Sequence, residues 1–235
     1  MTSKKILREH YSDIIYTNDD WSVLKRKRTE AISLLEIFVK EGFNPFIHGS
    51  IARGDVNESS DFDVIFLRKI PSFKIEILLN KYGYEKYFKE IIMATPLDTI
   101  KLYIHLSELE SITIPLSKPD KNYIEFYDFG GKINFNQLKL DIRVPGIDKR
   151  LVLIKPSIKG HEEISIIGNE ALAAKEVGIS INTINERKKV LVRRNKHGRT
   201  GVFLKRQIQI NESTEDAIKK LAKQKSIVRK KLFKI

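Results

Sequence analysis

Hydrophobic residues recur at intervals of three and four positions in two stretches of the first half of the chain. Residues 20–41 and residues 72–93 both follow this spacing, which predicts two amphipathic helices. Gly42 would end the first of them. Between the helices, residues 46–48 and 61–67 predict strands, because the second stretch alternates and then runs apolar, as a strand that becomes fully buried would.

The pattern changes in the second half of the chain. From about residue 99 to residue 154 it favours strands separated by turns. Beyond residue 158 the predicted elements are two helices at residues 170–177 and 181–189, a hairpin of residues 190–194 and 202–207, and a basic helix at residues 214–230.

Composition indicates a soluble globular protein. Hydrophobic residues make up 41% and charged residues 31% of the chain, which argues against disorder. No cysteine is present, so disulfides and thiolate metal sites are excluded. No apolar run approaches the ~20 residues that cross a bilayer, and the first residues lack the apolar core of a signal peptide. We therefore expect a cytoplasmic protein without a membrane partner.

The positive charge is concentrated at one end. The net charge is +13, and residues 161–235 hold 18 Lys/Arg against 8 Asp/Glu, whereas residues 1–160 hold 25 against 22. This asymmetry predicts a nearly neutral domain, residues 1–158, followed by a basic domain, residues 159–235, that meets a polyanion. A solvated lysine-rich surface, of the kind that thermophily or composition bias produces, is the alternative.

Two acidic residues mark the start of the strand predicted at residues 61–67. Residues two apart on a strand point to the same face, so Asp61 and Asp63 would project together while Phe62 and Val64 turn into the core. Neighbouring carboxylates repel unless a cation lies between them, and magnesium or manganese prefers such hard oxygen ligands. The pair therefore predicts a metal site for phosphoryl transfer.

A second group of residues, just upstream, predicts a phosphate site. Gly49 lets the backbone approach a phosphate closely, and the Ser50 hydroxyl can donate a hydrogen bond to a triphosphate. Arg53, about one turn later, could reach the same phosphates. The competing interpretation of the whole stretch is an acidic surface loop beside an unrelated turn.

A resemblance to the DNA polymerase β-type nucleotidyltransferase superfamily rests on two strings, GSIARGD at residues 49–55 and SDFD at residues 60–63. The residues of these two motifs are most similar to those of the archaeal CCA-adding enzymes and the minimal nucleotidyltransferases. The resemblance implies an α+β fold with a mixed sheet backed by helices. It also implies an NTP substrate, magnesium or manganese, and a third carboxylate from a later strand.

Two residues compete for the role of third carboxylate. Asp141 lies in the string LKLDIRV, which resembles the superfamily's third-acid strand. A period of two would place Lys139, Asp141 and Arg143 on one face of that strand. An exposed face with a local charge pair is the alternative. Asp98 is the rival, because it precedes a predicted strand at the distance that the minimal enzymes use, although Lys101 stands where those enzymes carry their acid.

The basic end of the chain predicts a nucleic-acid-binding module. Residues 170–187 resemble the helix-turn-helix of transcription and sigma-type factors, with Gly178 in the turn and Ser180 capping the second helix. The predicted hairpin would be the wing of a winged helix. A packing helical hairpin is the alternative. The residues expected to contact DNA or RNA are Arg187, Arg193, Arg194, Lys196, Arg199, Lys205 and Arg206.

These features together predict a nucleotidyltransferase that moves an NMP from an NTP to a hydroxyl group, with a nucleic acid as the expected acceptor. Two other functions stay open: a helix-turn-helix regulator that senses NTP without turnover, and a toxin-type transferase that modifies a protein or a tRNA end. The pattern leaves the nucleotide, the acceptor and the oligomeric state undetermined.

Overall fold

A computed structural model describes residues 5–84, 88–198, 200–209 and 211–233. The chain forms two compact units: unit 1 contains residues 1–33, 47–60 and 124–200, and unit 2 contains residues 34–46, 61–123 and 201–235. The divisions fall inside three elements, α1 (Asn18–Lys40), β2 (Pro45–His48) and α4 (Lys121–Gly130). Both units take residues from either side of position 158, and the domain division at that position stays a prediction.

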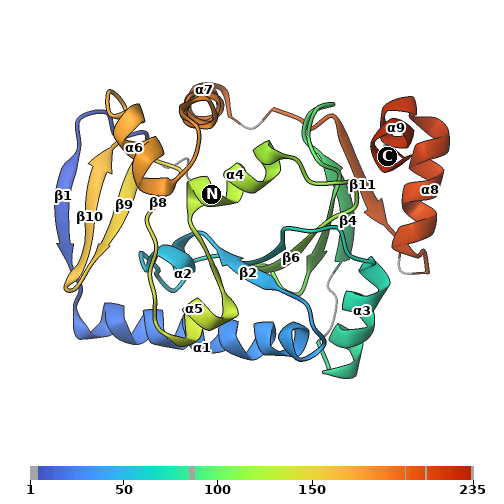
Figure 1. Ribbon diagram of the computed structural model, residues 1–235, viewed down its shortest axis with the longest axis horizontal. Helices are drawn as coiled ribbons and strands as arrows, with labels where there is room; N and C mark the ends of the chain where they lie inside the picture. The colour runs from blue at the N-terminus through green and yellow to red at the C-terminus, as the bar shows by residue number, and fades with distance from the viewer. Residues whose placement is uncertain (1–4, 85–87, 199, 210, 234–235) are drawn as a thin grey trace. The chain divides into compact units, whose positions relative to one another are not determined.

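Unit 1 contains a four-stranded antiparallel sheet, drawn at the left of Figure 1. Its strands, in order, are β1 (Tyr11–Ile15), β10 (Gly160–Ser165), β9 (Val152–Ser157) and β8 (Gly146–Ile147). Gly160 is required where β1 meets β10, because a Cβ there would lie 1.9 Å from the carbonyl oxygen of Ile14. The sheet can therefore close only around a residue without a side chain.

Two helices pack on this sheet through one apolar cluster. They are α6 (Glu170–Val177) and α7 (Ile181–His197), and both begin where the sequence predicts. Gly178 ends α6 in the left-handed conformation, and the Ser180 hydroxyl caps α7 by accepting from the Thr183 N–H. The cluster joins side chains of the strands and the residues beside them, of α4, and of both helices: Phe129, Ile147, Leu151, Leu153, Ile166, Ala173, Ala174, Ile184 and Leu191.

The predicted hairpin is wrong. Residues 190–194 continue α7 to His197, because Leu191 lies two turns after Ile184 and both are buried in the same cluster. Gly198, with φ of 74°, ends the helix. The second arm of the predicted hairpin is β11 (Leu204–Ile208), which belongs to unit 2 and pairs with β4 (Phe88–Met93). No wing therefore follows α7 in the described residues.

Unit 1 also contains two helical segments where strands are predicted. Most of α4 belongs to it, and α5 (Phe135–Lys139) follows β7 (Lys132–Asn134). Asn134 and Gln137 form a capping box at the start of α5, a local signal that competes with the strand-like composition of this stretch. The short helix α2 (Ser50–Arg53) carries the predicted phosphate residues Ser50 and Arg53, and Gly49 immediately precedes it.

Unit 2 contains five strands of a mixed sheet in the order β11-β4-β5-β6-β3. Its remaining strands are β5 (Lys101–His105), β6 (Glu110–Pro115) and β3 (Phe62–Phe66). Only β3 and β6 run parallel; the other pairs are antiparallel. The mixed sheet implied by the superfamily resemblance is therefore present in this unit.

The two faces of this sheet differ sharply. One face is apolar and buried, and the ring of Phe38 in α1 packs edge-on against Phe66 with 5.6 Å between centroids. By the strand registers, the opposite face carries Asp63, Ser111, His105, Tyr103 and Glu90. A polar row across an otherwise apolar sheet singles out that face as the candidate chemical surface.

The helix predicted at residues 72–93 is only half correct. The helix α3 (Ser72–Lys81) ends at Tyr82, and β4 takes up residues 88–93 with partners on both sides, β5 and β11. Two helices complete the unit, α8 (Thr214–Gln224) and α9 (Ser226–Phe233), where one helix is predicted. In the described part of the chain, no helix is both long and apolar enough to cross a membrane.

Candidate nucleotide and metal site

Asp63 lies on the polar face of β3, as the alternation predicts. Its neighbours Phe62 and Val64 are 5% and 0% exposed, whereas Asp63 is partly exposed. The prediction that Phe62 and Val64 enter the core is confirmed. Asp61 stands immediately before β3, and the Phe62 N–H that separates the two acids donates to the Leu109 carbonyl at 2.6 Å. The backbone hydrogen bonding of β3 therefore begins at Phe62, between Asp61 and Asp63.

Ser111 fixes the Asp63 carboxylate. The register of the parallel strands places Ser111 directly opposite Asp63, and its hydroxyl donates to Asp63 Oδ1 at 2.6 Å. A short hydrogen bond to a carboxylate is charge-assisted and restricts the rotamer of the acid. No motif in the sequence indicates Ser111; the polar alternation of Ser111 and Thr113 in β6 is the signal that could have indicated it.

The rest of the polar face extends away from Asp63. Burial, together with the charges of Asp63, Glu90 and Asp98, raises the pKa of Tyr103, so its phenol stays protonated. Glu90 is buried and pairs with Lys205 at 2.9 Å, while His105 Nε2 lies 3.4 Å from it. The face therefore combines acids, a phenol and an imidazole within one unit.

Asp98 has a structural role in a turn. Its Oδ2 accepts a hydrogen bond from the Thr95 N–H at 2.8 Å, before β5 begins at Lys101. The Lys101 ammonium lies 5.1 Å from the centroid of the Tyr123 ring. This turn contact explains an acid at position 98 without catalysis, and the metal role of Asp98 stays a prediction.

The predicted phosphate turn lies in unit 1 and has a well-defined backbone. Gly49 has φ of 85°, a conformation that L-residues rarely adopt, and its N–H donates to the Gly131 carbonyl at 2.9 Å. The buried Arg28 of α1 donates to the carbonyls of Ile51 and Ala52, the last turn of α2. Burial lowers the pKa of Arg28 to about 10, against the charge of Asp141. Sequence patterns did not indicate this anchor.

Arg53 is committed to protein partners. Its side chain is buried, and its Nε and Nη2 donate to Asp55 at 2.9 and 2.8 Å. Nη1 donates to the Gly130 carbonyl at 2.6 Å. Three of the guanidinium N–H groups are therefore used within the loop, and phosphate binding would have to draw on the others or break the ion pair. The nucleotide-binding roles of Gly49, Ser50 and Arg53 stay predictions.

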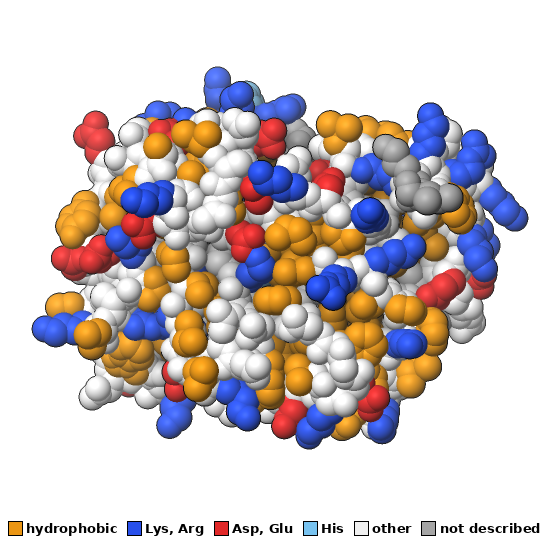
Figure 2. Space-filling view, viewed as in Figure 1, with side chains coloured by type: hydrophobic (Ala, Val, Ile, Leu, Met, Phe, Trp, Pro, Cys, Tyr) orange, Lys and Arg blue, Asp and Glu red, His pale blue; other side chains and the backbone are white. Residues whose placement is uncertain are grey.

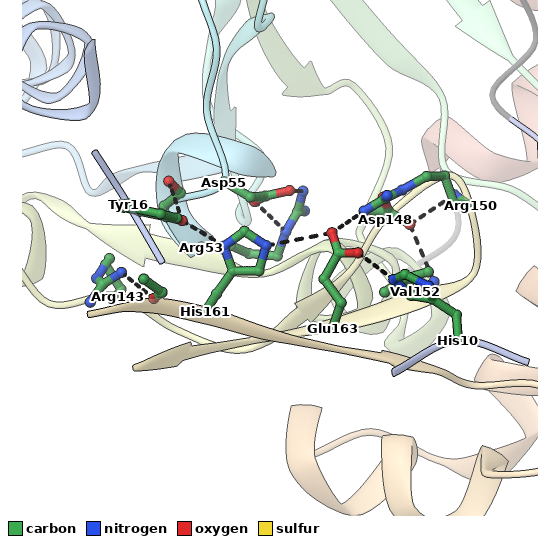
Figure 3. Close-up of polar contacts among 12 residues, drawn as sticks. His10, Tyr16, Arg53, Asp55, Arg143, Asp148, Arg150, Val152, His161 and Glu163 are labelled. Atoms are coloured by element: carbon green, nitrogen blue, oxygen red, sulfur yellow. Dashed lines mark hydrogen bonds and ion pairs between the residues drawn. The ribbon is translucent and has the colours of Figure 1, made fainter. Parts of the chain in front are cut away.

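A buried polar network ties this loop to the sheet of unit 1 (Figure 3). Tyr16 hydrogen-bonds to the Gly54 carbonyl at 2.9 Å and shares a hydrogen bond with His161 Nδ1 at 2.7 Å; burial raises its pKa to about 12. Glu163 accepts from His10 and Arg150. Burial opposes ionisation of Glu163, but these hydrogen bonds outweigh it and lower its pKa.

The strand predicted around Asp141 is wrong. α5 ends at Lys139, and Asp141 lies in the following turn with φ of 53°. Leu140, next to it, is 72% exposed. Arg143 instead packs over the Trp21 ring at 4.9 Å. Lys139, Asp141 and Arg143 therefore share no strand face, and the third-carboxylate role of Asp141 stays a prediction that has lost its geometric argument.

The residues predicted to bind nucleic acid are divided between the units. On α7, Arg193, Arg194 and Lys196 are exposed, whereas the Arg187 guanidinium lies over the Phe126 ring at 4.6 Å. In unit 2, Lys205 pairs with Glu90, and Arg206 donates to Glu212 and to the Ala217 carbonyl. Arg199 lies outside the described residues. The predicted hairpin that would have carried these residues is not formed, and their nucleic-acid-binding role stays a prediction.

A comparison with known protein families finds a match over the part of the chain that contains Asp61 and Asp63. Residues 33–120 match the family model of the nucleotidyltransferase domain. The match supports the nucleotidyltransferase superfamily and suggests a transferase with an NTP substrate. No curated protein and no solved structure matches the chain. Among the described residues, no group of three or more His, Asp or Glu side chains is arranged to hold a metal ion.

Proposed function

We propose that the protein is a magnesium-dependent nucleotidyltransferase that transfers an NMP from an NTP to a hydroxyl group of a nucleic acid. The observation that carries this proposal is the nucleotidyltransferase match over residues 33–120, which includes both Gly49-Ser50 and Asp61-Phe-Asp63. The placement of Asp63 on a polar sheet face, with Phe62 and Val64 in the core, supports the chemical role of that acid.

Asp61 and Asp63 would hold the metal. Carboxylate oxygens are the ligands that Mg²⁺ and Mn²⁺ prefer, and two of them at the start of one strand fit a cation that also binds substrate phosphates. When bound, the metal would neutralise charge that develops on the triphosphate. Ser111 would act as a positioning residue, because its 2.6 Å hydrogen bond holds Asp63 Oδ1. Asp141 or Asp98 would supply the third carboxylate.

The transfer itself is a displacement at phosphorus. The acceptor oxygen forms a bond to the α-phosphorus, the bond from that phosphorus to the bridging oxygen of the β-phosphate breaks, and pyrophosphate leaves. The acceptor hydroxyl gives its proton to solvent water, and the electron pair of the broken bond leaves on pyrophosphate. Gly49 and Ser50 would hold the triphosphate through a backbone N–H and a hydroxyl. Positioning and electrostatic stabilisation would supply most of the rate, as in other phosphoryl transfers.

The charge distribution supports a nucleic-acid acceptor. Residues 161–235 carry 18 Lys/Arg against 8 Asp/Glu, and α7 exposes Arg193, Arg194 and Lys196. A polyanion would be attracted to such a surface in a salt-dependent way.

A second candidate is a regulator that binds NTP without turnover. The observation that favours it is the pair α6 and α7 joined at Gly178, which has the order and length of a helix-turn-helix. A transferase that modifies a protein is a third candidate, and one experiment separates the three.

The experiment incubates a cell extract with the protein, Mg²⁺ and each NTP labelled on the α-phosphate. We expect label in nucleic acid, and its loss in Asp63→Asn. The matched control is Asp13→Asn, which removes an exposed acid from β1 of unit 1. Label in protein would favour the third candidate. NTP binding without incorporation would favour the regulator, and equal incorporation by wild type and Asp63→Asn would refute the metal role of Asp63.

A further inference from the structure

We propose that the exposed side of the α8–α9 helical hairpin binds the phosphate backbone of a single-stranded nucleic acid. The residues concerned, here called the hairpin cations, are Lys219, Lys223, Arg229 and Lys230. The inference deepens the proposed function and rests on it for one point only, that the bound strand is the acceptor. The hairpin belongs to unit 2, the unit that also contains Asp61 and Asp63.

The charge of this segment is one-sided. Residues 217–235 contain eight Lys or Arg and no Asp or Glu. The acids of α8, Glu215 and Asp216, are confined to its first turn, where the helix dipole favours them. Cations in the last turn of a helix are favoured for the same reason. The basic residues of this segment are more numerous than the last turns of α8 and α9 can account for. Uncompensated charge of this density is typical of a surface that meets a polyanion.

The fold turns these cations outward. Ala217, Leu221, Ala222 and Val228 are buried, so the apolar sides of both helices are used within unit 2. The hairpin cations are all exposed. Figure 2 shows Lys and Arg side chains gathered along the right edge of the molecule, where Figure 1 draws α8 and α9. The surface therefore presents the hairpin cations to solvent, with Phe233 exposed at the end of α9.

The hairpin cations differ from their basic neighbours. Lys220 pairs with Glu212 at 2.8 Å, and Lys231 donates to the Leu97 carbonyl, so both have partners within the protein. In the part of the chain that the structure describes, no ion pair engages a hairpin cation. Lys219 and Lys223 stand one turn apart on α8, a like-charge spacing that a helix does not favour by itself. A ligand with regularly spaced negative charges would relieve this repulsion.

The chemistry favours nucleic acid over a lipid surface. A helix that lies in a membrane interface inserts its apolar side, but here Ala217, Leu221, Ala222 and Val228 of that side are buried, and Phe233 is exposed only at the end of α9. An aromatic residue stands at the edge of the basic surface: Phe203 is 41% exposed, and the Lys225 ammonium lies 5.6 Å from the centroid of its ring. A cation beside an exposed ring suits a base stacked next to its phosphate, as in single-strand binding.

The test measures binding of a fluorescent single-stranded RNA and of the DNA of the same sequence, without NTP or Mg²⁺, over a range of salt concentrations. The variant Lys219→Gln/Lys223→Gln/Arg229→Gln/Lys230→Gln should bind more weakly. The slope of log K against log salt should fall by about 3, since each phosphate contact on a single strand contributes about 0.7. The control Lys40→Gln/Lys74→Gln/Lys81→Gln/Lys118→Gln removes the same charge from exposed positions elsewhere in unit 2 and should keep most of the slope.

The outcomes separate this inference from the proposed function. Equal slopes for wild type and the hairpin variant, with both folded by circular dichroism, would overturn the inference whatever the transferase assay shows. An equal loss in the control variant would overturn it too, because net charge alone would then explain binding. If vesicles containing phosphatidylserine, but not the oligonucleotides, distinguish the variant from wild type, the surface is a lipid site and the inference is wrong. Slope loss in the hairpin variant of a protein without transferase activity would support the surface and refute the enzyme.

Discussion

The predicted phosphate turn in unit 1 and the strand in unit 2 that carries Asp63 are held in place by different means. The turn at residues 49–55 is tied down by Arg28, by the Arg53–Asp55 ion pair and by Tyr16, all largely buried. Asp63 is held by its strand and by one hydrogen bond from Ser111. Substitutions that remove contacts of the turn should therefore lower the free energy of unfolding. Substitutions around Asp63 should mainly lower transferase activity. The predictions below test this contrast.

The largest effect is expected at Asp63. Asp63→Asn keeps the shape of the side chain and removes the charge that would hold the metal, so transferase activity should fall by about 10³-fold or more. The free energy of unfolding should change little, because Asp63 is partly exposed. Steady-state kinetics and urea unfolding of the same preparation check both statements. A large loss of stability would show that Asp63 stabilises the fold, as the buried network of unit 1 does, and would contradict the difference between the two units.

The next effect is expected in unit 1, at Glu163. Glu163→Gln removes the anionic partner of the buried His161 and one of the two anionic partners of the half-buried Arg150, which keeps Asp148, and should destabilise unit 1 by about 3 kcal/mol, or about 100-fold in the folding equilibrium. The pKa of Glu163 is lowered in the folded state, so its contribution is present above pH 4.5 and lost as the pH falls through the lowered pKa. Urea unfolding as a function of pH should show a smaller loss of stability in acid for the variant than for wild type. An unchanged pH dependence would contradict the assignment.

Gly49→Ala should have a smaller effect on stability. No atom lies within 4 Å of the added Cβ, so the cost comes from the backbone conformation with φ of 85° alone, about 2 kcal/mol. Gly201→Ala is the matched control, because it also has open space and its φ lies outside the strained range. Thermal unfolding of the two variants compares them directly. Equal stability of both would show that the turn relaxes freely and is not rigidly held.

The smallest effect is expected at Ser111. Ser111→Ala removes one hydrogen bond to a carboxylate, which should lower kcat/KM about 10-fold and raise the Mg²⁺ concentration needed for half-maximal activity. Ser111→Thr keeps the hydroxyl in a strand and should restore most of the activity. A magnesium titration is the measurement that a merely structural role would not change. If Thr fails to rescue while both variants stay folded, Ser111 does not position Asp63.

Local patterns predicted the elements whose signals are strong and self-contained. The apolar spacing of α1, the alternation around Asp63, and the Gly178 and Ser180 boundaries of α6 and α7 are all found where the sequence predicts them. In each case the residues that decide the conformation lie within one turn or one strand. The candidate acids were predictable for the same reason, since Asp61 and Asp63 are two positions apart.

Partners distant in sequence decided the rest. β4 has a helical spacing of apolar residues, but pairing with β5 and β11 makes it a strand, and burial of Leu191 beside Ile184 extends α7 through the predicted hairpin. Arg53 meets Gly130 and Glu163 meets His10 only after folding. The sequence alone determined where the carboxylates, hydroxyls and cations of the candidate sites stand along the chain, because those properties belong to single side chains and their nearest neighbours. Tertiary structure decided which of them are committed to internal partners, because a hydrogen bond or ion pair depends on a distance that no local pattern specifies.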